Sequence, residues 1–107
     1  MGRFLVLWHR SPVAPWPEDP VESSKLVEKL WMGIDNLIKK GTMKEFGYFL
    51  DGMSGYAIGE GDSVETFRNV SMFGPYIESE VQEIIPYEKA KGTLRALWKT
   101  LAEAAKK

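Results

Sequence analysis

The chain has 107 residues, which suits a single domain, and its formal net charge of −1 argues against a nucleic-acid partner. Cysteine is absent, which excludes disulfides, zinc–thiolate sites and thiol nucleophiles. Hydrophobic residues make up 44% and charged residues 27%, the balance of an ordinary globular protein.

The first predicted element is a strand over Phe4–Trp8, which is apolar at both alternating positions. Its even-numbered residues would face one side of the sheet, and its odd-numbered residues would face the other side together with His9. Because both sets are apolar, the pattern is that of a strand buried on both faces. Five apolar residues are too few for a signal-peptide core or a membrane span, so we expect a cytoplasmic protein without a membrane partner. The proline-rich segment 11–20 predicts a loop of restricted shape.

A long helix is predicted next, with Asp19 or Ser23 as its N-cap and Gly41 at its end. Its apolar residues recur at helical spacing and form one broad stripe of Leu26, Val27, Leu30, Trp31, Ile34, Leu37 and Ile38. We therefore expect Trp31 to be a core residue.

Alternating apolar residues predict a β-hairpin after this helix. Its strands are expected over Glu45–Leu50 and Tyr56–Ile58, with the turn at Asp51–Gly55. The pattern indicates two strands that pair antiparallel.

The rest of the chain predicts two helices and one strand. A capping-box-like sequence at Asp62 begins the second helix, and Gly74-Pro75 ends it. The fourth strand is expected over Val81–Tyr87, and an amphipathic helix over about residues 93–106. Trp98 lies on the apolar stripe of this last helix and is expected to be a core residue.

This order of elements predicts a ferredoxin-like α+β fold, βαββαβ, with a four-stranded antiparallel sheet, helices on one face and an added C-terminal helix. We expect a single domain over residues 1–107, with its core in residues 3–87. The uncovered face of the sheet would carry large apolar groups, and such a face usually marks an interface. The pattern thus favours a homodimer formed through the sheet.

The chain resembles the dimeric α+β barrel superfamily in its element order, its opening strand Phe4–His9, and its strand Gly55–Glu60 that leads into the Asp62-capped helix. Muconolactone isomerases, cofactor-free antibiotic-biosynthesis monooxygenases, YCII-like proteins and stress-responsive barrel proteins belong to that superfamily. The resemblance covers about residues 3–87. It implies two sheets packed face to face, with a ligand cleft between sheet and helices or inside the barrel.

His9 is the candidate catalytic residue, because an imidazole titrates near neutrality and can serve as acid, base or ligand. The alternative is a packed or surface histidine at the end of a strand. YCII-like members pair a histidine with an aspartate, for which Asp35 and Asp51 have the right chemistry. Haem-degrading members carry a histidine on the second helix, and residues 63–70 contain none, so no cofactor is expected.

The candidate ligand-binding residues are Trp16, Tyr48, Tyr56 and Arg68. Trp16 could cover a cleft or anchor the proline-rich loop, and the two tyrosines could line the cavity or the dimer seam. Arg68 could contact a ligand or belong to a solvated helix face.

Two further patterns point to structure and not to chemistry. The glycines at 55, 59 and 61 lack the lysine and hydroxyl of a phosphate-binding loop, so turns and bulges explain them better. The glutamates at 78, 80 and 83 have no histidine or aspartate beside them, so no metal site is expected.

Three functions remain open. The chain could be a homodimer that binds a small apolar ligand with weak or no catalysis. It could be a cofactor-independent isomerase or monooxygenase acting on a small aromatic or polyketide-like compound, which the resemblance and His9 favour. It could also be a structural protein whose terminal helix docks a partner or embraces the second subunit.

Overall fold

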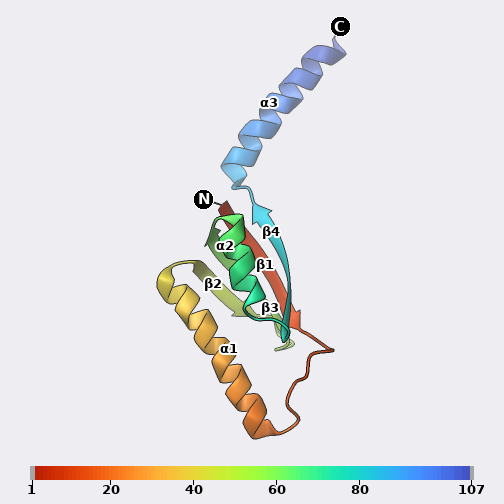
Figure 1. Ribbon diagram of the computed structural model, residues 1–107. Coiled ribbons are helices and arrows are strands. Elements are labelled where there is room, and N and C mark those ends of the chain that lie inside the picture. Colours follow the sequence, from red (N-terminus) through yellow and green to blue (C-terminus); the bar gives the residue numbers. More distant parts are fainter. Residues whose placement is uncertain (1, 107) are drawn as a thin grey trace.

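The computed structural model describes residues 2–106 and has the predicted order of elements (Figure 1). The elements are β1 (Gly2–Arg10), α1 (Pro20–Lys40), β2 (Met43–Tyr48), β3 (Ser54–Gly61), α2 (Ser63–Ser71), β4 (Ile77–Ile84) and α3 (Tyr87–Ala105). The fold is ferredoxin-like α+β with an added C-terminal helix, as the sequence predicted.

The four strands form one sheet in the order β2-β3-β1-β4, and each neighbouring pair is antiparallel. Val6 at the centre of β1 lies opposite Ala57 of β3 and Val81 of β4. Side chains alternate between the faces of a strand, so these three share one face with the other even-numbered residues of β1. Both α1 and α2 lie on that face (Figure 1).

Local signals in the sequence set the ends of α1. The carboxylate of Asp19 accepts a hydrogen bond from the backbone N–H of Val21, which makes Asp19 the N-cap and Pro20 the first helical residue. Gly41 adopts a φ of 82°, the left-handed conformation that glycine tolerates best, and ends the helix. Of the two predicted caps, the structure uses Asp19.

The hairpin turn lies two residues earlier than predicted, over residues 49–53. Asp51 accepts hydrogen bonds from the backbone N–H of Met53 at 2.9 Å and from the backbone N–H of Ser54 at 3.1 Å. These bonds, with a third from the Ser54 hydroxyl, favour the charged carboxylate and lower the pKa of Asp51. They close the turn two residues early, so β3 begins at Ser54 and Gly55 is a strand residue.

The last strand and last helix both begin earlier than predicted. β4 covers Ile77–Ile84 because it pairs with β1 as far as Arg10, and α3 begins at Tyr87 and not near Thr93. Pro86 explains the boundary: it lacks the N–H that would extend the sheet. Its carbonyl accepts a hydrogen bond from the N–H of Ala90 at 3.0 Å, which starts the helix.

The buried apolar core is small. Among the described residues it consists of Phe4 and Trp8 of β1, Leu37 of α1 and Ala57 of β3. The expectation that Trp31 and Trp98 are core residues is wrong, because their side chains are 42% and 66% exposed. Trp31 faces a cavity, and Trp98 lies on α3, which projects away from the sheet (Figure 1).

The projecting helix makes the molecule long. It measures 70 × 28 × 24 Å with a radius of gyration of 19.1 Å. A compact chain of this length has a radius of gyration of about 13 Å. Within residues 2–106, no helix has the length and apolar character needed to cross a membrane.

Candidate ligand-binding site

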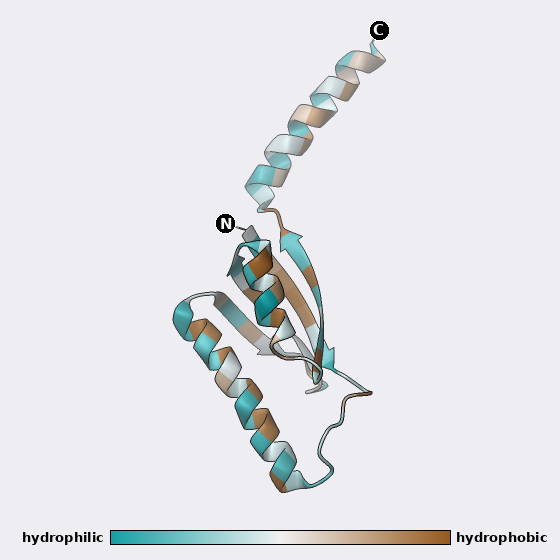
Figure 2. Ribbon diagram, in the orientation of Figure 1, coloured by the Kyte–Doolittle hydropathy of each residue, from teal (hydrophilic) through white to brown (hydrophobic). Residues whose placement is uncertain are grey.

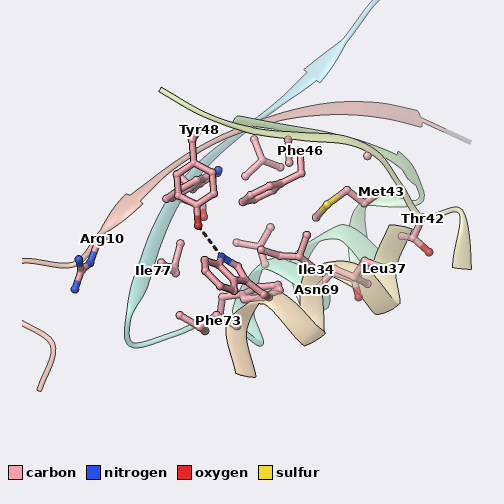
Figure 3. Close-up of a pocket in the computed structure, with 18 of the residues that line it drawn as sticks. Arg10, Ile34, Leu37, Thr42, Met43, Phe46, Tyr48, Asn69, Phe73 and Ile77 are labelled. Carbon is pink, nitrogen blue, oxygen red and sulfur yellow. Dashed lines mark hydrogen bonds between the residues drawn. The ribbon is translucent and has the colours of Figure 1, made fainter. Parts of the chain in front are cut away.

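A cavity of about 500 Å³ lies between the sheet and the helices α1 and α2 (Figure 3). Small-molecule sites in proteins typically measure about 300–1,000 Å³ and are mostly apolar. All four strands and both helices contribute to the lining, so the fold as a whole shapes this space.

Three aromatic rings form the sheet side of the cavity. Trp8 of β1 stacks on Phe46 of β2, with centroids 5.3 Å apart and planes 6° apart. Tyr48 stands edge-on to Trp8 at 5.0 Å and to Phe46 at 5.7 Å. Stacked and edge-to-face pairs of this kind are mutually stabilising, so the cluster is a firm apolar platform.

Gly55 makes room for this platform. A Cβ atom at Gly55 would lie 2.6 Å from the Trp8 ring and would also collide with the carbonyl of Gly47. The indole N–H of Trp8 donates to the carbonyl of Tyr56 at 3.4 Å, which holds the ring across β3. Gly55 therefore serves a close approach between a ring and the backbone, and not a turn.

The apolar stripe of α1 forms the opposite wall, where Leu30, Ile34 and Leu37 face the rings. Trp31 reaches toward the sheet, and its indole N–H donates to the hydroxyl of Tyr48 at 2.9 Å, the dashed line in Figure 3. This hydrogen bond joins α1 to β2 at the rim, since both side chains are partly exposed.

α2 and the segment after it close another side of the cavity. Thr66, Asn69 and Val70 line it from the helix, followed by Phe73. Phe73 also packs close to α1, where a Cβ atom at Gly33 would lie 3.2 Å from its ring. The hydroxyl of Thr66 donates its hydrogen to the carbonyl of Asp62 at 3.0 Å, so Asn69 is the lining side chain of α2 that can both donate to and accept from a ligand.

The proline-rich loop lies at the end of the cavity near Arg10. The guanidinium of Arg10 stacks 4.0 Å over the ring of Trp16, which packs on Tyr76 at 5.0 Å. The indole N–H of Trp16 donates to the carbonyl of Ser11 at 2.8 Å. Trp16 thus lines the cavity and anchors the loop, while Arg10 adds a positive charge at this end.

The structure brings only part of the predicted site together. Trp16 and Tyr48 line the cavity. Tyr56 and His9 lie on the opposite face of the sheet, in register with the odd-numbered residues of β1. Arg68 is exposed on α2, and its neighbour Asn69 faces the cavity instead.

His9 lies in an ordinary surface environment. Its Nε2 is 3.5 Å from a carboxylate oxygen of Glu78, and its side chain is 53% exposed. Strand alternation separates it from the cavity, because Trp8 and Arg10 point to the helix side. Its candidate aspartates, Asp35 and Asp51, are not among the residues that line the cavity.

The cavity is poor in titratable groups. Among the described residues that line it there is no histidine or aspartate, and the single acidic residue, Glu60, pairs with Arg3 on the other face of the sheet, where its carboxylate is 3.7 Å from the Arg3 guanidinium. Within residues 2–106, no three histidine or acidic side chains gather into a metal site. The geometry suits a mostly uncharged ligand.

Sequence reasoning missed several lining residues, among them Arg10, Trp31, Phe46 and Asn69. For Trp31 the signal was helical spacing, which is the same for a residue packed on a sheet and for one that faces a gap. Phe46 gave a strand signal with the same ambiguity. Arg10 and Asn69 carried no local signal.

No protein-family model and no curated protein matches this sequence. Strand order and register alone show the ferredoxin-like fold.

Proposed function

We propose that the chain is a binding protein for a small, largely apolar aromatic molecule, held in the cavity between α1 and the sheet. The cavity itself carries the proposal: it has about 500 Å³ of space lined by rings and aliphatic side chains. Empty apolar space is costly because the lining atoms lack contact partners, and a ligand of matching chemistry supplies those contacts.

The lining suggests the chemistry of the ligand. The Trp8–Phe46 platform favours a flat ring system, which would stack on it or meet it edge-on. Asn69 could hydrogen-bond one polar group of the ligand. The guanidinium of Arg10 lies 4.0 Å over the ring of Trp16, and its N–H groups could donate to a carbonyl or carboxylate oxygen of the ligand.

Binding is favoured over catalysis because His9, the candidate acid–base residue, lies on the other face of the sheet. We further propose that the protein forms a homodimer that covers this face. The large apolar side chains there support that proposal, because Leu7 is 39% exposed and Leu5, Tyr56 and Ile58 are also partly exposed.

The test uses 8-anilinonaphthalene-1-sulfonate, a fluorescent aromatic anion, as the probe. Gly59→Leu should fill the cavity without strain, because a Cβ atom there meets only the Thr42 carbonyl at 3.5 Å. We expect it to weaken probe binding by roughly tenfold or more, since several apolar contacts are lost. The matched control, Gly92→Leu, places the same side chain in open space on α3.

Chemical shifts locate the probe. Bound in the cavity, it should shift the indole N–H resonance of Trp31. Equal probe affinity in the wild type and Gly59→Leu, with no shift at Trp31, would overturn the proposal. Circular dichroism checks that both variants remain folded.

A further inference from the structure

Two apolar surfaces of this chain are uncovered. The open face is the side of the sheet opposite α1 and α2, and its apolar residues are Leu5, Leu7, Tyr56, Ile58 and Ile84. The α3 stripe consists of Leu94, Leu97, Trp98 and Leu101, each at least 48% exposed. In Figure 2 hydrophobic (brown) and hydrophilic (teal) bands alternate along the ribbon of α3.

The exposed surface is larger than that of a typical folded monomer of this mass. The accessible surface is 8159 Å² for a mass of 12.1 kDa. A folded monomer of this mass exposes about 6,000 Å². The excess, about 2,000 Å², is larger than the roughly 800 Å² that each partner buries in a standard interface.

The two surfaces have opposite charge. The open face carries the carboxylates of Glu45, Glu60, Glu78 and Glu80, against Arg3 and His9. α3 carries four basic residues, Lys89, Lys91, Arg95 and Lys99, against Glu88 and Glu103. Two open faces packed on each other would bring an excess of carboxylates together, whereas α3 on an open face brings opposite charges together.

The dimensions also match. A helix of 19 residues, the length of α3, spans about 28 Å. The open face is built on strands of 8 and 9 residues, which span about 26–30 Å. Two residues separate Ile84 from the start of α3 at Tyr87, and α3 runs away from its own sheet (Figure 1), so its stripe is free to pack on a second copy.

We propose that two copies exchange their C-terminal helices, so that the α3 stripe of each lies on the open face of the other. Such an arrangement is two-fold symmetric and closed, because each copy gives one helix and receives one. The inference rests on the homodimer of the proposed function and names the element that forms it, a helix in place of a second sheet.

The test measures molar mass by light scattering for two charge-introducing variants. Leu97→Glu disrupts the α3 stripe, and Leu7→Glu disrupts the open face. Each variant alone should be monomeric, since both of its exchanged contacts are damaged. An equal mixture should form heterodimers, because the intact helix of Leu7→Glu can still cover the intact face of Leu97→Glu.

The control for the helix is Ala96→Glu, which adds the same side chain one residue away on the polar side of α3 and should remain a dimer. Leu7→Glu places a charge among apolar side chains and could fail to fold, so a second variant changes only the charge of surface residues on the open face. Glu78→Lys with Glu80→Lys should raise the dimer dissociation constant roughly tenfold or more. Mixing it with Lys91→Glu/Arg95→Glu should restore pairing.

Other outcomes separate the two proposals. A dimeric Leu97→Glu beside a monomeric Leu7→Glu would preserve the homodimer and overturn helix exchange in favour of packed sheets. A dimeric Leu7→Glu beside a monomeric Leu97→Glu would overturn helix exchange and favour a dimer in which the two α3 helices pack on each other. A wild-type monomer would overturn both the exchange and the homodimer, while probe binding in the cavity would still be judged by Gly59→Leu.

Discussion

Gly55 and Trp8 show how one missing side chain shapes the cavity. The Trp8 ring lies so close over β3 that only glycine leaves room for it. The ring then meets Phe46 and Tyr48, and these contacts form the sheet side of the candidate site. A backbone position thus controls the geometry of a binding surface on the neighbouring strand.

We expect Gly55→Ala to destabilise the protein by about 1–3 kcal/mol, because the new methyl group must displace the Trp8 ring or the β2 backbone. It should also weaken probe binding, since the aromatic platform moves. Urea unfolding followed by circular dichroism gives the first value, and fluorescence titration gives the second.

Gly92→Ala is the matched control. A Cβ atom there meets nothing within 4 Å, and the residue lies inside α3. Replacing a helical glycine with alanine typically stabilises a helix by about 0.5–1 kcal/mol. If both variants changed stability alike, the explanation by steric contact with Trp8 would fail.

α1 is held at its two ends and across the cavity rim. Gly41 and Thr42 lead directly into β2, and the Pro-rich loop joins the other end to β1. Between these ends much of its apolar stripe faces the cavity instead of packing on the sheet. The hydrogen bond from Trp31 to Tyr48 is therefore one of few ties between the middle of the helix and the sheet.

Tyr48→Phe removes that tie and keeps the ring. We expect the middle of α1 to exchange its amide hydrogens several-fold faster, because a hydrogen bond of this kind contributes about 0.5–1.5 kcal/mol. Hydrogen exchange followed by mass spectrometry resolves the helix from the strands. The control Tyr87→Phe removes a hydroxyl from α3 and should leave α1 unchanged; equal exchange in wild type and Tyr48→Phe would show that the bond does not hold the helix.

The whole molecule is extended, and its stability should reflect that. With few fully buried side chains and a projecting helix, a single copy leaves much apolar surface in water. Burial of that surface between two copies would link folding to association. The proposed ligand would add to stability independently, through the cavity.

The thermal midpoint should therefore rise with protein concentration. For a dimer of this size we expect a shift on the order of 3 °C per tenfold increase, from the unfolding enthalpy typical of such chains. Differential scanning calorimetry at several concentrations measures it. Leu97→Glu should show no such dependence, and a wild-type midpoint that is independent of concentration would contradict association.

Much of the fold was predictable from the sequence because its signals are local. The caps Asp19 and Asp62, the stop at Gly41 and the spacing of apolar residues depend on neighbours within one or two turns. The boundary between β4 and α3 was harder, since pairing with β1 decides where the strand ends. Of the candidate site, only Trp16 and Tyr48 were both predicted and brought to the cavity.

The sequence by itself determined which segments are helices and strands, their order, and the alternation that places His9 and Trp8 on opposite sides of β1. Only the tertiary structure decided which of those sides faces the helices, that a cavity separates much of α1 from the sheet, and that α3 projects away from the sheet. The reason is physical: a periodic pattern fixes which residues share a face, while the occupant of that face is set by contacts between distant segments.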